Sequence, residues 1–202
     1  SFKKESLESL INKKTKAIII NSPNNPSGKI FSLNELKLIN EIVKKRNIYI
    51  ISDEVYDENI FFGKKFYSIN HFNESSKNII IINGFSKSHS MTGWRIGYAC
   101  VPDNLINKMN NICLHINTNI NTFVQNGLFS VNSKKNNNLL KFNQELESKI
   151  TFTSKLFETS NKINIYKPMG GLFIFLDISK TRMKSEEFVY KLLKKYKIAT
   201  IS

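Results

Sequence analysis

Cysteine is scarce in this chain of 202 residues, which contains only Cys100 and Cys113. Because the first lies in a strand-like pattern and the second in a helix-like pattern, the sequence suggests no disulfide framework. Long apolar runs are lacking as well, and none could span a bilayer. The chain starts at Ser1 and shows no charged leader followed by an apolar signal region. We therefore expect a soluble protein of the reducing cytoplasm, with no membrane partner.

Arginine is scarce relative to lysine, since only Arg46, Arg95 and Arg182 stand among the 30 basic residues. Against 16 acidic residues the net charge is +14, which would ordinarily suggest a nucleic-acid partner. The lysines and the abundant asparagines are scattered, however, and form no periodic stripe interleaved with aromatic residues. This composition indicates a genome biased toward A and T, so we expect no nucleic-acid partner.

Histidine is limited to His71, His89 and His115, whose spacing is not that of metal ligands. No metal site is therefore expected. We also find no internal repeat. The length suits one large domain, or a domain and a half, with a sizeable core.

Three short, continuous apolar runs stand at residues 17–20, 48–51 and 79–82. Such runs are typical of strands that are buried on both faces of a parallel sheet. Helical patterns separate them, and the clearest one begins at a capping box formed by Ser32 and Glu35. The alternation predicts an α/β domain in which a mostly parallel sheet is flanked by helices.

The second half of the chain is predicted to be mainly helical. Apolar residues recur at helical spacing from 105 to 131, and we attribute these stripes to core packing. A polar break at residues 133–138 precedes a long helix that should end near Glu158. The remaining predicted elements are strands at 163–166 and 172–178 around a turn at 168–171, a helix at 185–195 and a final strand from Ile198.

Polar residues of chemical interest stand at or just past the ends of the predicted strands. They are Asn25 after the first strand, Asp53 and Tyr56 after the second, and Lys87 after the third. In parallel sheets, ligands bind outside the carboxyl ends of the strands. The sequence alone therefore predicts a site at this edge.

Residues 83–98, NGFSKSHSMTGWRIGY, connect the third apolar run to a further strand-like run at residues 95–101. A lysine that follows a buried strand, as Lys87 does, can be desolvated, which frees its amine to act as a nucleophile. Arg95, eight residues later, offers a planar fork of donors suited to phosphate. Taken alone, the stretch is still better explained as a surface loop in a lysine-rich chain.

Three ordered segments together resemble the class I and II aminotransferases, which use pyridoxal 5'-phosphate, and in particular the branch related to aspartate aminotransferase. They are NSPNNPSGK at 21–29, ISDEVYDE at 51–58, and the stretch at 83–98. The similarity runs over nearly the whole chain. It implies that residues 1–132 are part of the cofactor-binding large domain, a fold-type I transferase domain. Residues 133–202 would supply the interdomain helix and the start of a smaller α+β domain.

The resemblance also implies that this chain is an internal fragment, inactive by itself. In the family, upstream segments supply further phosphate contacts and an aromatic ring that stacks on the cofactor. A downstream segment supplies the arginine that binds the α-carboxylate of the substrate. None of these segments is recognisable in the sequence.

The resemblance gives roles to four of the polar residues. Lys87 would form the internal aldimine with the cofactor and shuttle the proton during catalysis. Asp53 would face the pyridine nitrogen and keep it protonated, although an aspartate here could also cap a turn. Tyr56 and Asn25 would donate to the phenolic oxygen of the cofactor, and Asn25 would also reach the substrate carboxylate.

The phosphate group of the cofactor would be bound by Arg95, helped by Ser86 and by backbone N–H groups of the loop. Some family members carry a phosphate-binding serine three residues before the lysine. Gly84 stands there in this chain, which places that one contact in doubt. Trp94 is expected to pack rather than to contact substrate.

The activity implied is the transfer of an amino group between an amino acid and a 2-oxo acid by a homodimeric enzyme. Two alternatives stay open. The complete protein could be another fold-type I pyridoxal-phosphate enzyme, such as a lyase or synthase, because the same cofactor residues serve several reactions. It could also be a transcription regulator with an aminotransferase-like sensor domain. The sequence does not indicate the side chain of the substrate.

Overall fold

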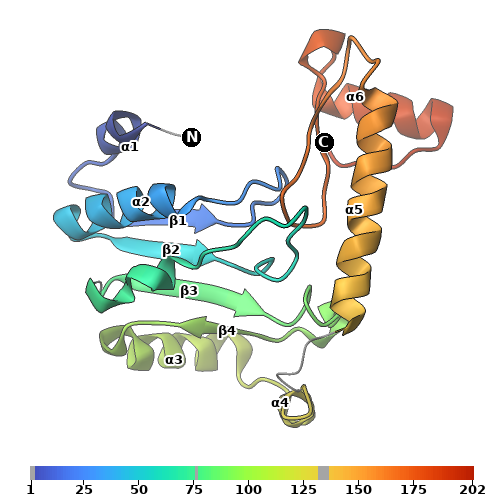
Figure 1. Cartoon of the computed structure of the whole chain (residues 1–202). Coiled ribbons are helices and arrows are strands. Elements are labelled where there is room, and N and C mark those ends of the chain that lie inside the picture. The colour runs from blue at the N-terminus through green and yellow to red at the C-terminus, as the bar shows by residue number, and fades with distance from the viewer. Residues whose placement is uncertain (1–2, 76, 132–136) are drawn as a thin grey trace.

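The computed structural model describes residues 3–75, 77–131 and 137–202 (Figure 1). Its centre is a four-stranded sheet in the order β1-β2-β3-β4. The first three strands are parallel and the fourth is antiparallel to β3, so the prediction of a mostly parallel sheet is confirmed. The strands are β1 (Ala17–Asn21), β2 (Tyr49–Asp53), β3 (Ile79–Gly84) and β4 (Gly97–Cys100).

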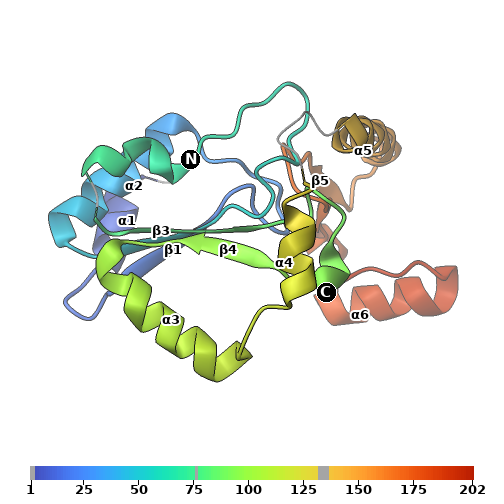
Figure 2. The ribbon, with the colours of Figure 1, turned by 90° about the horizontal axis from the view of Figure 1, so that it is seen from below.

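One face of the sheet is covered by helices α1 (Lys4–Leu10) and α2 (Leu33–Arg46), as Figure 2 shows. The predicted capping box fixes the start of α2. The Ser32 hydroxyl accepts from the N–H of Glu35 at 3.3 Å, and the Glu35 carboxylate accepts from the N–H of Ser32 at 2.9 Å. The box thus satisfies backbone donors that the first turn of a helix leaves unpaired.

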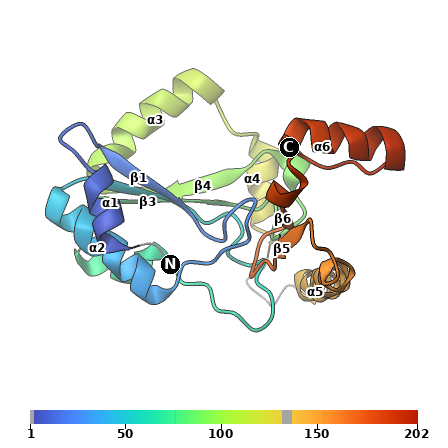
Figure 3. The same cartoon turned by 90° about the horizontal axis from the view of Figure 1, so that it is seen from above.

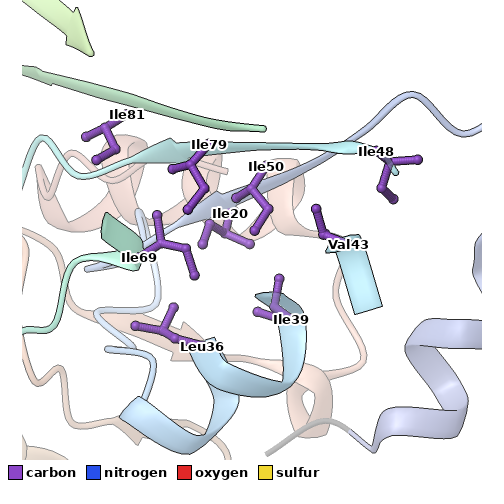
Figure 4. Close-up of a cluster of buried hydrophobic side chains, with 9 residues drawn as sticks. All are labelled: Ile20, Leu36, Ile39, Val43, Ile48, Ile50, Ile69, Ile79 and Ile81. Atoms are coloured by element: carbon purple, nitrogen blue, oxygen red, sulfur yellow. The ribbon is translucent and has the colours of Figure 1, made fainter. Parts of the chain in front are cut away.

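The hydrophobic core lies between α2 and this face of the sheet (Figure 4). Apolar residues of α2 recur every three or four positions and meet alternate residues of β2 and β3. Val43 of the helix and Ile50 of β2 have no exposed surface. Burial of each such aliphatic side chain stabilises the folded state by about 1.5–3 kcal/mol. The core therefore keeps the strands, and the starts of the loops that follow them, in fixed positions. Its members are Ile20, Leu36, Ile39, Val43, Ile48, Ile50, Ile69, Ile79 and Ile81.

The opposite face of the sheet is largely open, which contradicts the prediction that these strands are buried on both sides. Ile19 of β1 is 73% exposed and Ile82 of β3 is 42% exposed. A continuous apolar run predicts burial on both faces only where other elements supply a second layer. The described residues on that side do not supply one over β1 and β3.

The helices on the open side are α3 (Asp103–Asn117) and α4 (Thr122–Leu128) (Figure 2). Between them they bury only Val124. Ile116 of α3 is 72% exposed and Phe123 of α4 is 67% exposed. The attribution of these apolar stripes to core packing is therefore wrong for this chain.

Residues 137–202 gather beyond the carboxyl ends of β1, β2 and β3 (Figures 1 and 3). The long helix α5 (Asn137–Phe157) is formed as predicted, whereas the polar break at 133–138 falls mainly on residues 132–136, outside the described residues. The boundary predicted at 132/133 lies there too. A small antiparallel sheet then pairs β5 (Asn164–Tyr166) with β6 (Phe175–Asp177).

The predicted strand at 172–178 is shortened to β6, because β5 offers only three residues for pairing. Helix α6 (Ser185–Lys191) continues into a π-helical turn at Leu192–Tyr196. The final strand predicted from Ile198 is wrong, since residues 198–202 form no ladder with another described strand. A strand needs a neighbour to satisfy its backbone hydrogen bonds. Within the described ranges, no helix is long and apolar enough to cross a membrane.

The turn at 168–171 is hydrogen-bonded to the loop after β1 and to the loop after β2. The N–H of Met169 donates to the carbonyl of Gly28 at 2.9 Å, and the N–H of Phe61 donates to the carbonyl of Met169 at 2.9 Å. Gly28 has a φ of 68°, and a Cβ there would collide with Pro168. Glycine is therefore required where the two halves of the chain meet.

Helix α5 is attached to the loop after β2 by two side chains. Asn143 donates to the carbonyl of Glu58 at 2.8 Å, and the Glu147 carboxylate accepts from the N–H of Phe62 at 2.8 Å. Asn143 also accepts from the amide of Asn59 at 3.2 Å, and Asn59 has no exposed surface. These bonds fix the loop that starts just after Tyr56.

Candidate functional site

The carboxyl ends of β1, β2 and β3 lie side by side. Asn21 and Asp53, the last residues of β1 and β2, are partners in the parallel register. Gly84, the last residue of β3, stands opposite Gly97, where β4 begins. This edge and the loops that leave it carry every residue proposed from the sequence for cofactor binding: Asn25, Asp53, Tyr56, Ser86, Lys87 and Arg95.

Asn25 and Tyr56 meet across two loops. The Asn25 amide donates to the Tyr56 hydroxyl at 3.4 Å. Tyr56 is only 4% exposed, and a turn closed by the N–H of Asp57 on the carbonyl of Glu54 holds it. Burial and the negative charge of Asp53 raise the pKa of Tyr56, and the bond from Asn25 only partly opposes this. The hydroxyl therefore keeps its proton at neutral pH and can donate it in a hydrogen bond.

Asp53 uses one carboxylate oxygen locally. Its Oδ1 accepts from the N–H of Val55 at 3.2 Å, so the expected alternative use as a turn cap is observed. Among the described residues, its other oxygen has no hydrogen-bond donor. The half-buried side chain can thus cap the turn and still present a negative oxygen to a ligand.

Lys87 lies on a turn directly after β3, closed by the N–H of His89 on the carbonyl of Phe85 at 3.1 Å. Its Nζ is 5.9 Å from the centre of the Tyr56 ring. Within the part of the chain that the structure describes, Nζ has no hydrogen bond or ion pair. The amine is therefore half-buried, unengaged and next to Tyr56.

The lysine turn is anchored by aromatic packing and by a close approach of backbones. The Phe85 ring lies 5.6 Å from His89 and 5.8 Å from Tyr98 of β4, measured between centroids. A Cβ at Gly84 would stand 3.2 Å from the carbonyl oxygen of Ile96 and from Cα of Gly97. A side chain at Gly84 would therefore require the neighbouring backbone of Ile96 and Gly97 to shift by a few tenths of an ångström.

Arg95 lies just before β4 rather than in it, so the strand predicted from residue 95 starts two residues late. It has a φ of 53° and donates from one guanidinium nitrogen to the carbonyl of Thr92 at 2.8 Å. The structure describes no contact from Arg95 or Ser86 to the other proposed site residues. Trp94, which was expected to pack, is 50% exposed.

Sequence reasoning missed Asn21 and gave no role to Glu54 and Asp57, two acidic residues of the loop after β2. Glu54 is 4% exposed. One of its oxygens accepts from the hydroxyls of Ser52 and Ser68 and from the N–H of Ile69. Burial raises the pKa of Glu54 despite these bonds. Burial also raises the pKa of Asp57, whose carboxylate accepts from the Asn83 amide at 2.8 Å.

A pocket of about 1020 Å³ separates Asn25 from the small second sheet. Its lining includes Asn25 and Pro26, residues of β5, β6 and α6, and residues 199–202, and most of it is apolar. An amino-acid-sized ligand would fit between the edge of the main sheet and the second half of the chain.

Comparison with known proteins decides the family. The model of the family "Aminotransferase class I and II" matches residues 1–202. The chain belongs to this family. Aspartate aminotransferase of Bacillus subtilis (strain 168) is 35% identical to this chain over 204 residues, which cover 98% of this chain and 52% of that protein.

Solved aminotransferase structures share the fold. The aromatic aminotransferase from Pyrococcus horikoshii OT3 gives a TM-score of 0.93 at 28% identity and covers 100% of this chain and 54% of that one. A putative aminotransferase from Clostridium difficile 630, with pyridoxal phosphate bound, gives a TM-score of 0.85 at 28% identity. The match covers 98% of this chain and 52% of that one. The chain thus spans about half the length of the aminotransferases it matches, and the resemblance seen in the sequence is confirmed.

Proposed function

We propose that the complete protein is an aminotransferase that uses pyridoxal 5'-phosphate to move an amino group between an amino acid and a 2-oxo acid. The observation that carries this is the free amine of Lys87 beside Tyr56, at the sheet edge that also bears Asp53. Membership of the family supports it. No observation favours a lyase, a synthase or a regulator.

The residues at this edge fit the cofactor by their chemistry. Bound pyridoxal phosphate supplies an electron sink for the carbanion that forms when the substrate loses its α-proton. It needs an amine, a carboxylate for the ring nitrogen, donors for the phenolic oxygen and a cation for the phosphate. Among the described residues, the Lys87 amine has no hydrogen bond or ion pair and one Asp53 oxygen has no donor, while Asn25 and Tyr56 can donate together.

Lys87 is proposed to hold the cofactor covalently and then to carry the proton that leaves the substrate α-carbon. A lysine amine that has lost its proton can serve both as nucleophile and as general base, and Lys87 is half-buried with no ion-pair partner among the described residues. Tyr56 lies beside Nζ and, because its pKa is raised, remains a hydrogen-bond donor there.

Asp53 is proposed to keep the pyridine nitrogen protonated, because a nearby negative charge favours the charged form of a base. Arg95 is proposed to bind the phosphate, since one bond to Thr92 leaves its other N–H groups available. Ser86 is its proposed helper. Asn25 is proposed to donate to the phenolic oxygen and to the substrate carboxylate.

For the domains, we propose that residues 1–132 belong to the cofactor-binding domain, and that residues 133–202 supply the interdomain helix and part of the small domain. The separation of the two sheets, with α5 beside them, supports this division. A homodimer in the cytoplasm stays our prediction for the complete protein.

Aspartate is the amino donor to test first, because several relatives are named aspartate aminotransferases. The complete protein with added cofactor should form oxaloacetate from aspartate and a 2-oxo acid. Lys87→Ala should abolish this activity, whereas Lys64→Ala, at an exposed lysine outside the site, should not. Equal activity of the two variants would refute the proposal.

A further inference from the structure

Asn21 joins two of the segments that carry proposed cofactor-binding residues, the end of β2 with Asp53 and the loop after β1 with Asn25. Its amide nitrogen donates to the backbone carbonyl of Asp53 at 3.2 Å, and its amide oxygen accepts from the backbone N–H of Asn25 at 2.7 Å. The side chain thus spans from the end of β2 to the loop after β1.

A single amide is suited to this bridge because it offers a donor and an acceptor on one rigid group. A carboxylate could accept from Asn25 but could not donate to the Asp53 carbonyl. That carbonyl already accepts from the N–H of Ser22 at 3.1 Å. Asn21 therefore adds a second bond at the same oxygen and links it to Asn25.

The bridge fixes the start of the loop that carries the Asn25 side chain. The amide oxygen of Asn21 also lies 3.4 Å from the Asn24 amide nitrogen, which donates to it. Asn24 in turn accepts from the Ser27 hydroxyl at 2.6 Å, which tightens the loop. With its backbone held from this side, Asn25 directs its own amide to the Tyr56 hydroxyl.

We propose that Asn21 is a positioning residue: it holds Asn25 in place so that Asn25 and Tyr56 donate together to the phenolic oxygen of the cofactor. This inference rests on the proposed function. Donors to an oxygen stabilise its ionised form, so a displaced Asn25 raises the pH at which the bound cofactor changes colour. It also weakens contact with the substrate carboxylate, which raises KM more than it lowers kcat.

The test compares Asn21→Ala with Asn78→Ala in the complete protein loaded with pyridoxal phosphate. Asn78 lies outside the site, and its amide donates to Asn47 at 3.2 Å, so its variant also loses a bond between side chains. For Asn21→Ala we expect a higher midpoint pH of the visible absorption, and a KM raised by about two- to tenfold, the range for one lost hydrogen bond. Asn78→Ala should leave both unchanged.

A double variant tests whether Asn21 acts through Asn25. If it does, Asn21→Ala should add no shift in midpoint pH to a protein that already carries Asn25→Ala. Additive shifts would overturn the proposal, as would a loss of thermal stability in Asn21→Ala with an unchanged midpoint and KM. If Asn21→Ala does not fold, Asn21→Ser keeps at most one of the two bonds, and an unchanged midpoint and KM in that variant would overturn the proposal as well.

The wild-type protein separates this inference from the proposed function. If the complete wild type takes up no cofactor, the proposed function is refuted and the role of Asn21 with it. If the wild type binds cofactor and transaminates while Asn21→Ala behaves like it, only the role of Asn21 is refuted.

Discussion

Lys87 places its amine 5.9 Å from the centre of the Tyr56 ring, although the two residues stand on loops after different strands. Neither loop could set this distance by itself. The parallel pairing of β2 with β3 sets it, by ending both strands at one edge. The sheet therefore assembles the site from residues that are far apart in the chain.

Asp53→Asn separates binding of the cofactor from its use. The amide keeps the size of the side chain and an oxygen for the Val55 N–H, but it removes the negative charge. Cofactor should still bind, whereas proton abstraction should slow by at least about a hundredfold, which corresponds to two factors of ten in transition-state stabilisation. Single-turnover kinetics at full cofactor occupancy measure this. Near-normal abstraction would mean that Asp53 only caps its turn.

Arg95→Lys tests the phosphate contact. Lysine keeps the charge but loses the planar fork, so we expect affinity for the cofactor to fall by about tenfold. Arg182→Lys is a matched control, because Arg182 is also exposed and has a φ of 58°. Titration of the protein with pyridoxal phosphate measures the affinity. Equal effects of the two substitutions would place the phosphate elsewhere.

Glu54→Gln tests the buried acid of the site loop. Because burial raises the folded-state pKa of Glu54 above the unfolded value of about 4.5, the folded state binds more protons between these two values. The wild type should therefore lose stability as pH rises through that window, and Glu54→Gln should lose less. The amide oxygen of glutamine can still accept from Ser52, Ser68 and Ile69.

Urea midpoints of both proteins from pH 5 to pH 8 give the result, and their difference should grow with pH in favour of the variant. A constant difference would mean that Glu54 does not titrate in this range. Glu35 contributes equally to the pH dependence of stability in both proteins, so its contribution cancels in the difference. Burial alone would raise the pKa of Glu35, but the bonds from Lys29 and Ser32 outweigh burial and lower it.

Gly28→Ala tests the junction between the two halves of the chain. Alanine at a φ of 68° is strained, and its Cβ would collide with Pro168. Gly63→Ala isolates the strain, because Gly63 has a φ of 63° but no atom near its missing Cβ. We expect about 1–2 kcal/mol of destabilisation at Gly63 and clearly more at Gly28. Similar losses of unfolding free energy for the two variants, measured by denaturant unfolding, would mean that the backbone around Pro168 shifts at little cost to accommodate the Cβ.

The sequence predicted those parts of the fold that depend on local patterns. The capping box of Ser32 and Glu35 correctly predicted the start of α2. The apolar runs at 17–20, 48–51 and 79–82 form parallel strands as expected. The sequence wrongly predicted that the face around Ile19 is buried and that a strand begins at Ile198. Both depend on whether a partner element is present, which a local pattern does not contain.

The same limit applies to the site. The positions of Lys87 and Tyr56 after strands predicted that the two residues lie at one edge of the sheet, because parallel strands end together, and the structure does bring them together there. The bridge made by Asn21 depends on its register opposite Asp53, and register arises only when strands pair. The burial of Glu54 depends on Ser68 and Ile69 of a later segment. Such contacts join distant parts of the chain and leave no local signal.

The most direct test of the central claim is chemical trapping in the complete protein. Borohydride reduction of the cofactor-loaded protein should fix pyridoxal phosphate to one lysine, because the proposed contacts to the ring nitrogen, phenolic oxygen and phosphate hold the cofactor beside a single amine. Peptide mapping by mass spectrometry should find the label on Lys87. A label on Lys64, Lys65 or any other lysine would contradict the account.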